Sequence, residues 1–347
     1  MKIGQRDIGM QSHPFLIAEM SGNHNQSLER ALAIVDAAAS AGAHAIKLQT
    51  FTPDAMTLDI AEGEFFIGDP ASPWRGSSLH ALYSVAMTPW EWHEPIMKRA
   101  RQHGLACFSS PFDDTAIDFL ESLDVPAYKI ASFENIHLPL IRRAASTGKP
   151  LIISTGMASA AELSDAVETA RAAGCRDLVL LKCTSTYPAT PSNSNILTIP
   201  HMRTLFGCEV GLSDHTMGVG VAVAAVAHGA TVIEKHLTLA RADGGVDSTF
   251  SLEPAEFRAL ADETLRAWQG LGQVSYGPMP EELRSVGYRR SIYVAEDVRT
   301  GETFDVHNLR IVRPGVGLAP KFFDMAVGRK AARDIRKGTP LSWNLIA

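Results

Sequence analysis

The sequence predicts an α/β protein: a (β/α)8 TIM barrel followed by a small C-terminal β-rich domain. Eight short apolar runs alternate with longer helical patterns through most of the 347 residues, as in parallel βαβ units. The chain is long enough for a barrel of about 250 residues and a further domain. An open doubly wound sheet is the alternative, but no G-x-G-x-x-G motif follows the first predicted strand.

Each predicted strand is a short apolar run that ends in polar residues. In chain order the strands cover residues 15–20, 45–50, 105–110, 127–132, 151–156, 178–184, 209–214 and 231–237. Helix signals lie between the strands. Ser27 and Gly42 mark the start and stop of one helix, while Ser159, Glu162 and Gly174 give a capping box and a C-terminal glycine for another.

Two segments interrupt this alternation. Residues 52–84 are rich in Pro, Gly and acidic side chains and are too long for an ordinary βα loop, so we expect them to cover the site as a lid. Residues 272–288 are a turn-rich linker. We therefore divide the chain into a barrel domain over 1–271, this linker, and a β-rich domain over 289–347 in which the pattern D-[VI]-R-[TK]-G occurs twice.

The composition excludes several classes of protein. The net charge of −6, with 46% hydrophobic and 20% charged residues, describes a globular chain without the basic stripe that nucleic-acid binding requires. We find no apolar run of membrane-spanning length and no signal-peptide pattern. The four cysteines lack C-x-x-C spacing. We predict a cytoplasmic protein that binds neither nucleic acid nor membrane.

Polar side chains stand near the C-terminal ends of all the predicted strands. In a barrel these ends converge on one face, where the chemistry takes place. Strand alternation predicts that Glu234 and His236 face this site and that Lys235 points the other way. The strand-end set is Glu19, Lys47, Gln49, Ser109, Ser110, Lys129, Ser132, Ser154, Cys183, Thr184, Ser213, Asp214, His215, Glu234 and His236.

Two lysines in this set indicate an anionic substrate. Lys47 and Lys129, together with several serines, are suited to phosphate and carboxylate oxygens. A lysine in a desolvated barrel site can also form a Schiff base with a ketone. Composition alone leaves both chemistries open.

Two histidines at neighbouring strand ends indicate a divalent metal site. His215 and His236 have Glu19, Asp214 and Glu234 nearby, and the remaining coordination positions would be open to water or substrate. One buried histidine is more often a hydrogen-bonded core residue, so the prediction depends on the pair.

Several ordered motifs resemble the sialic acid synthase (nonulosonic acid synthase) family. RRSIYVAEDVRTGE and VRPGVGLAP are similar to its antifreeze-like (SAF) domain, so the resemblance covers nearly the whole chain. The motifs of the barrel are IAEMSGNHN (17–25), IKLQT (46–50), SSPFD (109–113), YKIAS (128–132), STGMAS (154–159), GLSDHT (211–216) and IEKHLTL (233–239).

The resemblance implies that phosphoenolpyruvate condenses with an open-chain N-acetylated amino sugar, giving a nonulosonic acid and phosphate by C–O cleavage. AEMSGNHN, LQTFTPDAMTLD and RADGGVDSTFSLEP are most similar to the branch that makes pseudaminic acid, whose acceptor is 2,4-diacetamido-2,4,6-trideoxy-altrose. N-acetylneuraminate and legionaminic acid synthesis are the alternatives within the family. Gln26 departs from the family pattern, in which Gly commonly follows NHN.

The resemblance also implies roles for individual residues. The expected catalytic set is Glu19, Lys47, Gln49, Glu234 and Asp247. Within it, Glu19 orients the sugar or transfers a proton, Glu234 is the alternative base, and Gln49 supports the lysine or the acceptor. Phosphoenolpyruvate is expected to be bound by Lys47, Ser110 and Ser132 at its carboxylate and by Lys129, Ser154, Ser185 and Ser213 at its phosphate.

Family members use a divalent ion, often manganese, so we expect Mn²⁺ on His215 and His236, with Mg²⁺ or Co²⁺ as alternatives. Tyr187 and Asp247 are expected to approach the acceptor sugar, together with Glu19. In this family the arginine that matches Arg313 reaches the acceptor across a domain-swapped homodimer, which would also stabilise so small a C-terminal domain.

Two functions of other classes stay open. A Schiff-base aldolase would use Lys47 or Lys129 as its nucleophile. A carbohydrate- or ice-binding protein would use the C-terminal domain for recognition and the barrel as a scaffold, but we find no flat repetitive threonine face.

Overall fold

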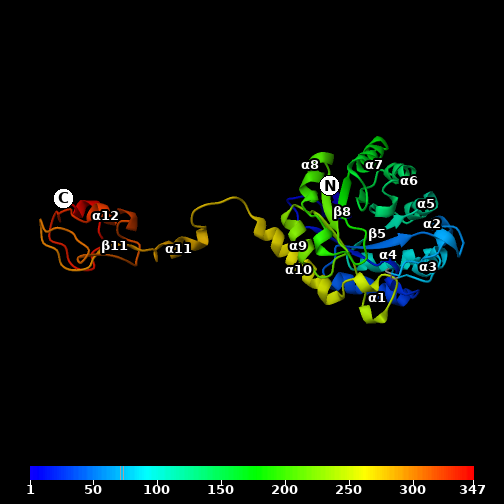
Figure 1. Ribbon diagram of the computed structural model, residues 1–347, viewed down its shortest axis with the longest axis horizontal. Helices are drawn as coiled ribbons and strands as arrows, with labels where there is room; N and C mark the ends of the chain where they lie inside the picture. The colour runs from blue at the N-terminus through cyan, green and yellow to red at the C-terminus, as the bar shows by residue number, and fades with distance from the viewer. Residues whose placement is uncertain (71, 73) are drawn as a thin grey trace. The chain divides into compact units, whose positions relative to one another are not determined.

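The computed structural model describes residues 1–70, 72 and 74–347. Parallel strands close into a barrel in the order β10-β3-β4-β5-β6-β7-β8-β9 (Figure 1), which confirms the predicted fold. Each strand overlaps the run predicted for it. They are β3 (Phe15–Glu19), β4 (Ala45–Thr50), β5 (Ala106–Pro111), β6 (Tyr128–Ile130), β7 (Leu151–Ser154), β8 (Leu178–Cys183), β9 (Glu209–Ser213) and β10 (Val232–His236).

The strand register brings the predicted site residues together. Glu19 at the end of β3 is level with Lys47 on one side and with His236 on the other. Ser213 on β9 is level with Glu234 of β10. Residues far apart in the sequence therefore become neighbours at one end of the barrel.

Helices surround the barrel and begin at the predicted caps. The Ser27 hydroxyl accepts a hydrogen bond from the Arg30 amide (3.2 Å), and Ser159 forms a capping box with Glu162. The surrounding helices are α1 (Leu28–Ser40), α4 (His93–Gln102), α5 (Asp114–Ser122), α6 (Leu138–Ala145), α7 (Ala160–Ala172), α8 (Thr198–Phe206), α9 (Gly220–Ala227) and α10 (Pro254–Leu271).

The main hydrophobic core lies between the strands and these helices. Strands in a helix-covered parallel barrel are buried on both faces, which explains their continuous apolar runs. All of Leu178, Val179, Leu180 and Leu181 in β8 are buried, for example. A short antiparallel hairpin, β1 (Lys2–Ile3) with β2 (Arg6–Asp7), precedes the barrel.

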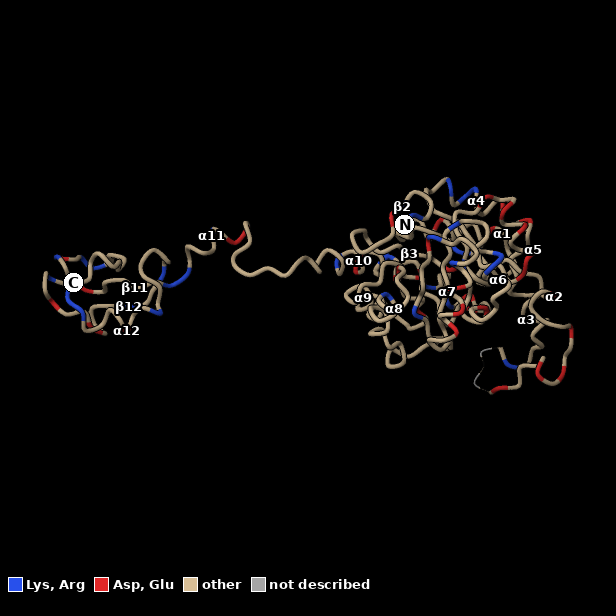
Figure 2. Tube along the Cα trace, turned by 90° about the horizontal axis from the view of Figure 1, so that it is seen from above, with Lys and Arg blue, Asp and Glu red and all other residues tan. Residues whose placement is uncertain are grey.

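Residues 71 and 73 of the predicted lid lie outside the described residues, and the rest of the segment between β4 and α4 contains two short α-helices. They are α2 (Pro53–Met56) and α3 (Leu79–Ala86), and α3 is capped by Ser78. Because α3 continues past the predicted end at residue 84, we use the term lid segment for residues 52–87. Its acidic positions, including Asp54 and Glu62, are exposed. Figure 2 shows acidic residues in red near α2 and α3.

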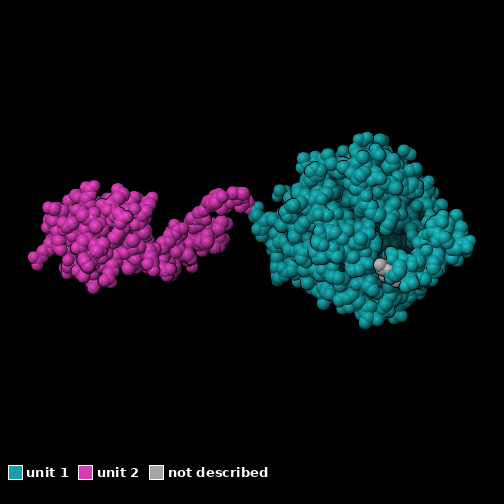
Figure 3. Space-filling model, viewed as in Figure 1, with its two compact units in different colours: residues 1–272 teal, residues 273–347 magenta. Residues whose placement is uncertain are grey.

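The chain divides into two compact units, Met1–Gly272 and Gln273–Ala347 (Figure 3). The second unit contains α11 (Leu283–Val286), an antiparallel pair of β11 (Ser291–Val294) and β12 (Leu309–Val312), and α12 (Phe323–Ala326). Its own small core includes Ile292, Phe304 and Leu341.

The repeated D-[VI]-R-[TK]-G pattern links two turns of this second unit. Asp334 accepts a hydrogen bond from the Thr300 amide (2.7 Å), and Asp297 accepts one from the Lys337 amide (2.7 Å). Each copy of the pattern therefore caps the turn of the other copy.

Among the described residues, no helix is both long enough and apolar enough to cross a membrane.

Candidate active site

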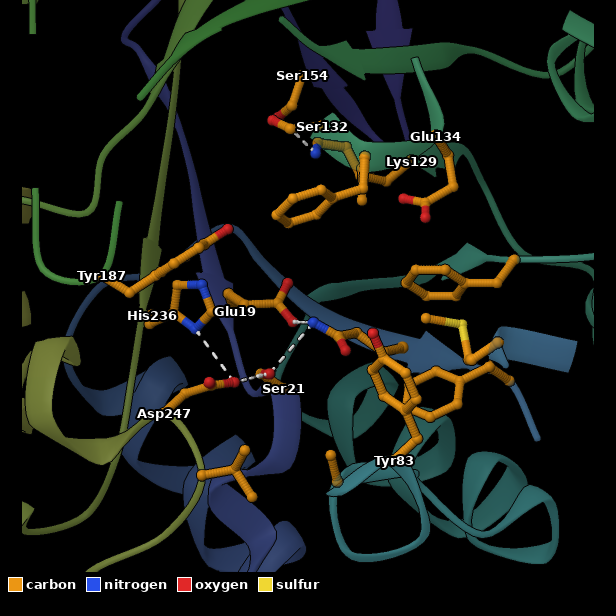
Figure 4. Close-up of a pocket in the computed structure, with 18 of the residues that line it drawn as sticks. Glu19, Ser21, Tyr83, Lys129, Ser132, Glu134, Ser154, Tyr187, His236 and Asp247 are labelled. Carbon is orange, nitrogen blue, oxygen red and sulfur yellow. Dashed lines mark hydrogen bonds and ion pairs between the residues drawn. The ribbon is translucent and has the colours of Figure 1, made fainter. Parts of the chain in front are cut away.

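A cavity of about 420 Å³ lies at the C-terminal ends of the barrel strands. Figure 4 shows side chains from the strands and their following loops converging on it. Its wall contains most of the residues predicted from the sequence. These are Glu19, Lys47, Gln49, Lys129, Ser132, Ser154, Cys183, Tyr187, Ser213, His215, Glu234, His236 and Asp247.

Four buried charged residues form a continuous network in this wall. Lys47 is paired with Glu19, and its Nζ lies 3.9 Å from Glu234 Oε2. Lys129 Nζ lies 3.6 Å from Glu234 Oε1 and donates a hydrogen bond to the Ser154 hydroxyl (2.7 Å). The network places two ammonium groups at the wall of one cavity, as binding of a multiply charged anion requires.

Burial and charge pairing act in opposite directions on this network. Burial raises the pKa of Glu19 to about 7, although Lys47 partly opposes the change. Burial also raises the pKa of Glu234, but Lys129 and Lys47 outweigh it and lower the pKa overall. Glu19 can therefore hold a proton near neutral pH, whereas Glu234 remains a carboxylate.

Two of the predicted serines lie beside the cavity rather than in its wall. Ser110 accepts a hydrogen bond from Lys47 Nζ (3.3 Å), and Ser185 Oγ lies 4.0 Å from Cys183 Sγ. A Cβ atom at Gly156 would collide with the hydroxyls of Ser185 and Ser132. Glycine at this position therefore leaves room for both hydroxyls to approach the backbone closely.

The histidine pair is suited to hold a divalent cation. The ring centroids of His215 and His236 lie 5.4 Å apart. His215 Nδ1 lies 2.9 Å from the Thr184 carbonyl oxygen, so it donates there and its Nε2 is left as a ligand. His236 Nδ1 is buried without a hydrogen-bond partner, and Asp247 Oδ2 lies 4.0 Å from it.

Nitrogen ligands arranged in this way fit a divalent ion. Within residues 1–70, 72 and 74–347, no group of three or more His, Cys, Asp or Glu side chains is arranged to hold a metal. An ion on the two histidines would therefore need water or substrate oxygens to complete its coordination.

Asp214, which the sequence placed near the two histidines, does not line the cavity with them. Its Oδ2 accepts a hydrogen bond from Lys235 Nζ (2.8 Å), which also donates to the Thr216 carbonyl oxygen (2.6 Å). Because Lys235 points away from the cavity, as alternation predicts, Asp214 is its counter-ion there. Ser109 also lies outside the cavity wall and shares a hydrogen bond with Thr50 (2.6 Å).

Ser21 is a polar residue of the wall that the strand pattern did not predict, because it follows β3 rather than ending it. Its hydroxyl donates to Asp247 Oδ2 and accepts from Gln49 Nε2 (3.1 Å). Gln49 Nε2 also donates to Glu19 Oε1 (3.3 Å). Figure 4 shows Ser21 beside Asp247, with a dashed line joining the two side chains.

One side of the cavity, formed by the lid segment and by the residues that directly follow β4 and β5, is apolar. Phe51 makes edge-to-face contacts with Tyr83 and Phe112, with ring centroids 5.8 and 5.2 Å apart. We call this side the apolar wall; it consists of Phe51, Met56, Ile67, Leu79, Leu82, Tyr83, Ala86 and Phe112. Sequence periodicity could not place the wall residues of the lid segment, since that segment belongs to no barrel strand.

Glu134 was also missed, because it lies in a short 3-10 helix, Ser132–Glu134, beyond the end of β6. Its side chain lines the cavity, and burial raises its pKa to about 7. Its Oε2 is buried without a hydrogen-bond partner. A carboxyl group in this position costs stability once it ionises.

Replacement of Glu134 is expected to stabilise the protein, and more so at high pH. A carboxyl whose folded-state pKa exceeds its unfolded value binds more protons when folded, so stability falls as pH rises from about 4.5 to about 7. We expect Glu134→Gln to raise the free energy of unfolding by about 2 kcal/mol at pH 8 and by little at pH 5. Thermal unfolding at the two pH values measures this difference.

The exposed Glu168 on α7 supplies the control, since Glu168→Gln should change stability equally little at both pH values. Equal gains for Glu134→Gln at pH 5 and pH 8 would contradict the raised pKa.

Arg313 lies in the second unit and is exposed there. Its predicted contact with the acceptor in a partner subunit stays a prediction.

Comparison with known proteins identifies the family. The sequence profile of the NeuB family matches residues 34–276, and that of the SAF domain matches residues 289–347. The pseudaminic acid synthase of Campylobacter jejuni is 43% identical over 94% of this chain and 95% of its own length. The pseudaminic acid synthase of Helicobacter pylori is 39% identical over 96% of this chain and 98% of its own length.

Other relatives act on different sugars. The N,N'-diacetyllegionaminic acid synthase of Legionella pneumophila is 35% identical over 96% of this chain and 94% of its own. The crystal structure of N-acetylneuraminic acid synthetase from Leptospira borgpetersenii, in complex with citrate, has a TM-score of 0.74 and 30% identity; the match covers 82% of this chain and 94% of that one. The chain therefore belongs to the NeuB family and carries a C-terminal SAF domain.

Proposed function

We propose that the protein is a pseudaminic acid synthase, a transferase that condenses phosphoenolpyruvate, water and 2,4-diacetamido-2,4,6-trideoxy-altrose to pseudaminic acid and phosphate. Relatives at 39–43% identity over about 95% of the chain carry this name. The observation that carries the proposal is the placement of Lys47 and Lys129 beside the pair His215 and His236 in one cavity. An anion and a carbonyl substrate could meet there.

The reaction balances without an oxidant or reductant. C3 of phosphoenolpyruvate attacks the aldehyde carbon, and the new hydroxyl takes up a proton. Water adds at C2 of the oxocarbenium-like centre, after which the C2–O bond breaks and phosphate leaves. The two protons of the water end on the sugar hydroxyl and the phosphate.

The residues of the network divide this chemistry between them. Lys47 and Lys129 bind the carboxylate and phosphate of phosphoenolpyruvate as point charges, with nearby serine hydroxyls as neutral donors. Glu19, with its pKa raised by burial to about 7, supplies the proton to the aldehyde oxygen. Glu234, held as a carboxylate by Lys129 and Lys47, accepts a proton from the attacking water.

A divalent ion, Mn²⁺ by preference with Mg²⁺ or Co²⁺ as alternatives, would be held by His215 and His236. When bound, such an ion supplies Lewis-acid polarisation of the sugar aldehyde. Tyr187 contributes to the acceptor side of the site, because its ring packs 4.6 Å from that of His215.

The apolar wall supports a 6-deoxy acceptor. A sugar that ends in a methyl group and carries two acetamido groups presents apolar surface that aromatic and aliphatic side chains can bury. N-acetylmannosamine has a hydroxymethyl group in place of that terminal methyl, and its hydroxyl would lose its water on burial against this wall.

The wild-type protein is therefore expected to prefer 2,4-diacetamido-2,4,6-trideoxy-altrose over N-acetylmannosamine. Exchange of an apolar contact for a buried hydroxyl predicts a difference in kcat/KM of roughly 100-fold or more. Phosphate release with each acceptor, at fixed phosphoenolpyruvate and Mn²⁺, measures the ratio.

The acceptor of N,N'-diacetyllegionaminate synthesis, tested in parallel, separates the two diacetamido branches. Preference for N-acetylmannosamine would contradict the proposed acceptor. Borohydride trapping of pyruvate on Lys47 or Lys129, detected as added intact mass, would instead favour the Schiff-base aldolase.

We further propose a cytoplasmic homodimer with swapped C-terminal domains, in which Arg313 contacts the partner's acceptor sugar. The exposure of Arg313 and the small core of the second unit are compatible with this arrangement.

A further inference from the structure

We propose that Ser21 is a positioning residue that orients the Asp247 carboxylate toward the acceptor sugar. The inference rests on the proposed function and adds a residue to which neither the strand pattern nor the family resemblance gives a role. Ser21 lines the cavity and is 2% exposed. Its hydroxyl lies between Gln49 and Asp247, so it can act on both.

The hydrogen bonds at Ser21 have a defined direction. A hydroxyl has one proton, and this one is donated to Asp247 Oδ2. The hydroxyl oxygen then accepts from Gln49 Nε2 (3.1 Å), which also donates to Glu19 Oε1 (3.3 Å). One chain of hydrogen bonds thus runs from Glu19 through Gln49 and Ser21 to Asp247.

The Asp247 carboxylate at the far end of this chain also accepts a hydrogen bond from the Gly22 amide. Asp247 is nearly fully buried at 9% exposure, and His236 Nδ1 lies 4.0 Å from its Oδ2, beyond hydrogen-bond range. The Asp247 backbone is held separately, through its carbonyl oxygen and the Ser251 hydroxyl (2.6 Å). The Asp247 carboxylate is therefore oriented by one backbone amide, that of Gly22, and by the side chain of Ser21.

The backbone at Ser21 is strained, because a residue with a Cβ atom stands in a conformation that favours glycine. Ser21 has φ of 49°, in the left-handed region that favours glycine and disfavours residues with a Cβ atom. Strain of this kind costs about 1 kcal/mol or more and is often found at functional sites.

The surrounding loop imposes this conformation. The Asn23 side chain donates to the Leu237 carbonyl oxygen (3.0 Å) and to Ser251 Oγ (2.9 Å), which ties the loop to the end of β10. A glycine at position 21 would adopt this positive φ with less strain. We therefore infer that the serine is present for the hydrogen bonds of its hydroxyl, which glycine lacks.

Ser21→Gly and Ser21→Ala separate the two roles of the residue. Both remove the hydroxyl, but only the glycine relieves the strained φ. We expect kcat/KM for the acceptor to fall roughly 10- to 100-fold in both variants, because small misplacement of a binding group has effects of this size. The melting temperature of Ser21→Gly should equal or exceed that of the wild type, and the KM for phosphoenolpyruvate should stay unchanged in both.

Asp124→Gly is the matched control. Asp124 also has positive φ (52°), but it precedes β6, at the opposite end of the barrel from the cavity. This variant should keep full activity. A double-mutant cycle with Asp247→Asn adds a second test, since Ser21→Ala should cost little more in that background if it acts through Asp247.

A crystal structure of Ser21→Gly tests the positioning without reference to the acceptor. A rotated Asp247 carboxylate is the expected result. An unmoved Asp247, wild-type acceptor kinetics in Ser21→Gly, or a full additional loss in the double variant would overturn the role of Ser21. An inactive wild-type protein with a rotated Asp247 in the variant would contradict the proposed function instead.

Discussion

Removal of divalent ions is expected to abolish condensation, and His236→Ala is expected to lower kcat/KM by roughly 1,000-fold or more. Loss of several kcal/mol of charge stabilisation at the aldehyde oxygen corresponds to a factor of this size. The reason lies in the ligand geometry: His236 Nδ1 is buried without a partner, and His215 is held by the Thr184 carbonyl oxygen. Phosphate release is measured after exhaustive chelation and again after Mn²⁺ is added back.

The control for His236→Ala is His103→Ala. His103 follows α4 and its side chain, 37% exposed, pairs with Asp36 on the surface, so its removal should leave activity intact. Direct Mn²⁺ titration of the wild type and His236→Ala gives a readout that does not depend on turnover. Full activity after chelation would exclude the proposed role of the histidine pair.

Lys47→Met is expected to combine a loss of activity with a loss of stability. Lys47 is the cation shared by Glu19 and Glu234, so its removal leaves the Glu234 carboxylate, and Glu19 whenever it is ionised, with too little positive charge. Breaking a buried ion pair in this way typically costs 3–5 kcal/mol, and we expect about that loss in the free energy of unfolding. We expect kcat/KM for phosphoenolpyruvate to fall by about 1,000-fold, because a charged contact with the substrate is also lost.

A paired variant separates these two effects. Lys47→Met/Glu19→Gln also removes the Glu19 carboxylate. We therefore expect this double variant to regain much of the free energy of unfolding lost in Lys47→Met, while its activity stays low. Chemical denaturation measures stability and steady-state kinetics measures activity. Near-wild-type stability of Lys47→Met alone would contradict the ion-pair network.

The barrel strands were predictable because their apolar runs are buried on both faces and end in polar residues. The alternation in β10 correctly turned Glu234 and His236 toward the cavity and Lys235 away from it. The C-terminal end of β6 was predicted less accurately, since the strand ends at Ile130 and a 3-10 helix begins at Ser132.

Other features of the site depend on contacts that sequence periodicity does not encode. Asp214 follows β9 as His215 does, but the long Lys235 side chain reaches it from the neighbouring strand. Most of the apolar wall comes from the lid segment, whose residues have no place in the strand pattern, while Phe51 and Phe112 directly follow β4 and β5. Glu134 and Ser21 lie one turn beyond their strands, and only the folded loops bring them to the cavity.

The Gln26 departure has a local explanation. Gln26 has φ of 54°, where a glycine is easily accommodated. Its side-chain amide donates to the carbonyl oxygens of Val85 (2.8 Å) and Met87 (2.9 Å) at the end of the lid segment. The glutamine thus gives this segment two hydrogen bonds that glycine could not supply.

Isotope transfer from phosphoenolpyruvate tests the central claim most directly. Phosphoenolpyruvate labelled with ¹⁸O in the oxygen between C2 and phosphorus is incubated with the protein, Mn²⁺ and the diacetamido sugar. Condensation by C–O cleavage predicts that the label leaves in inorganic phosphate, with a nonulosonic acid formed in equal amount and no phosphate released without the sugar. Label retained in the organic product, or phosphate release that does not need the sugar, would contradict the account.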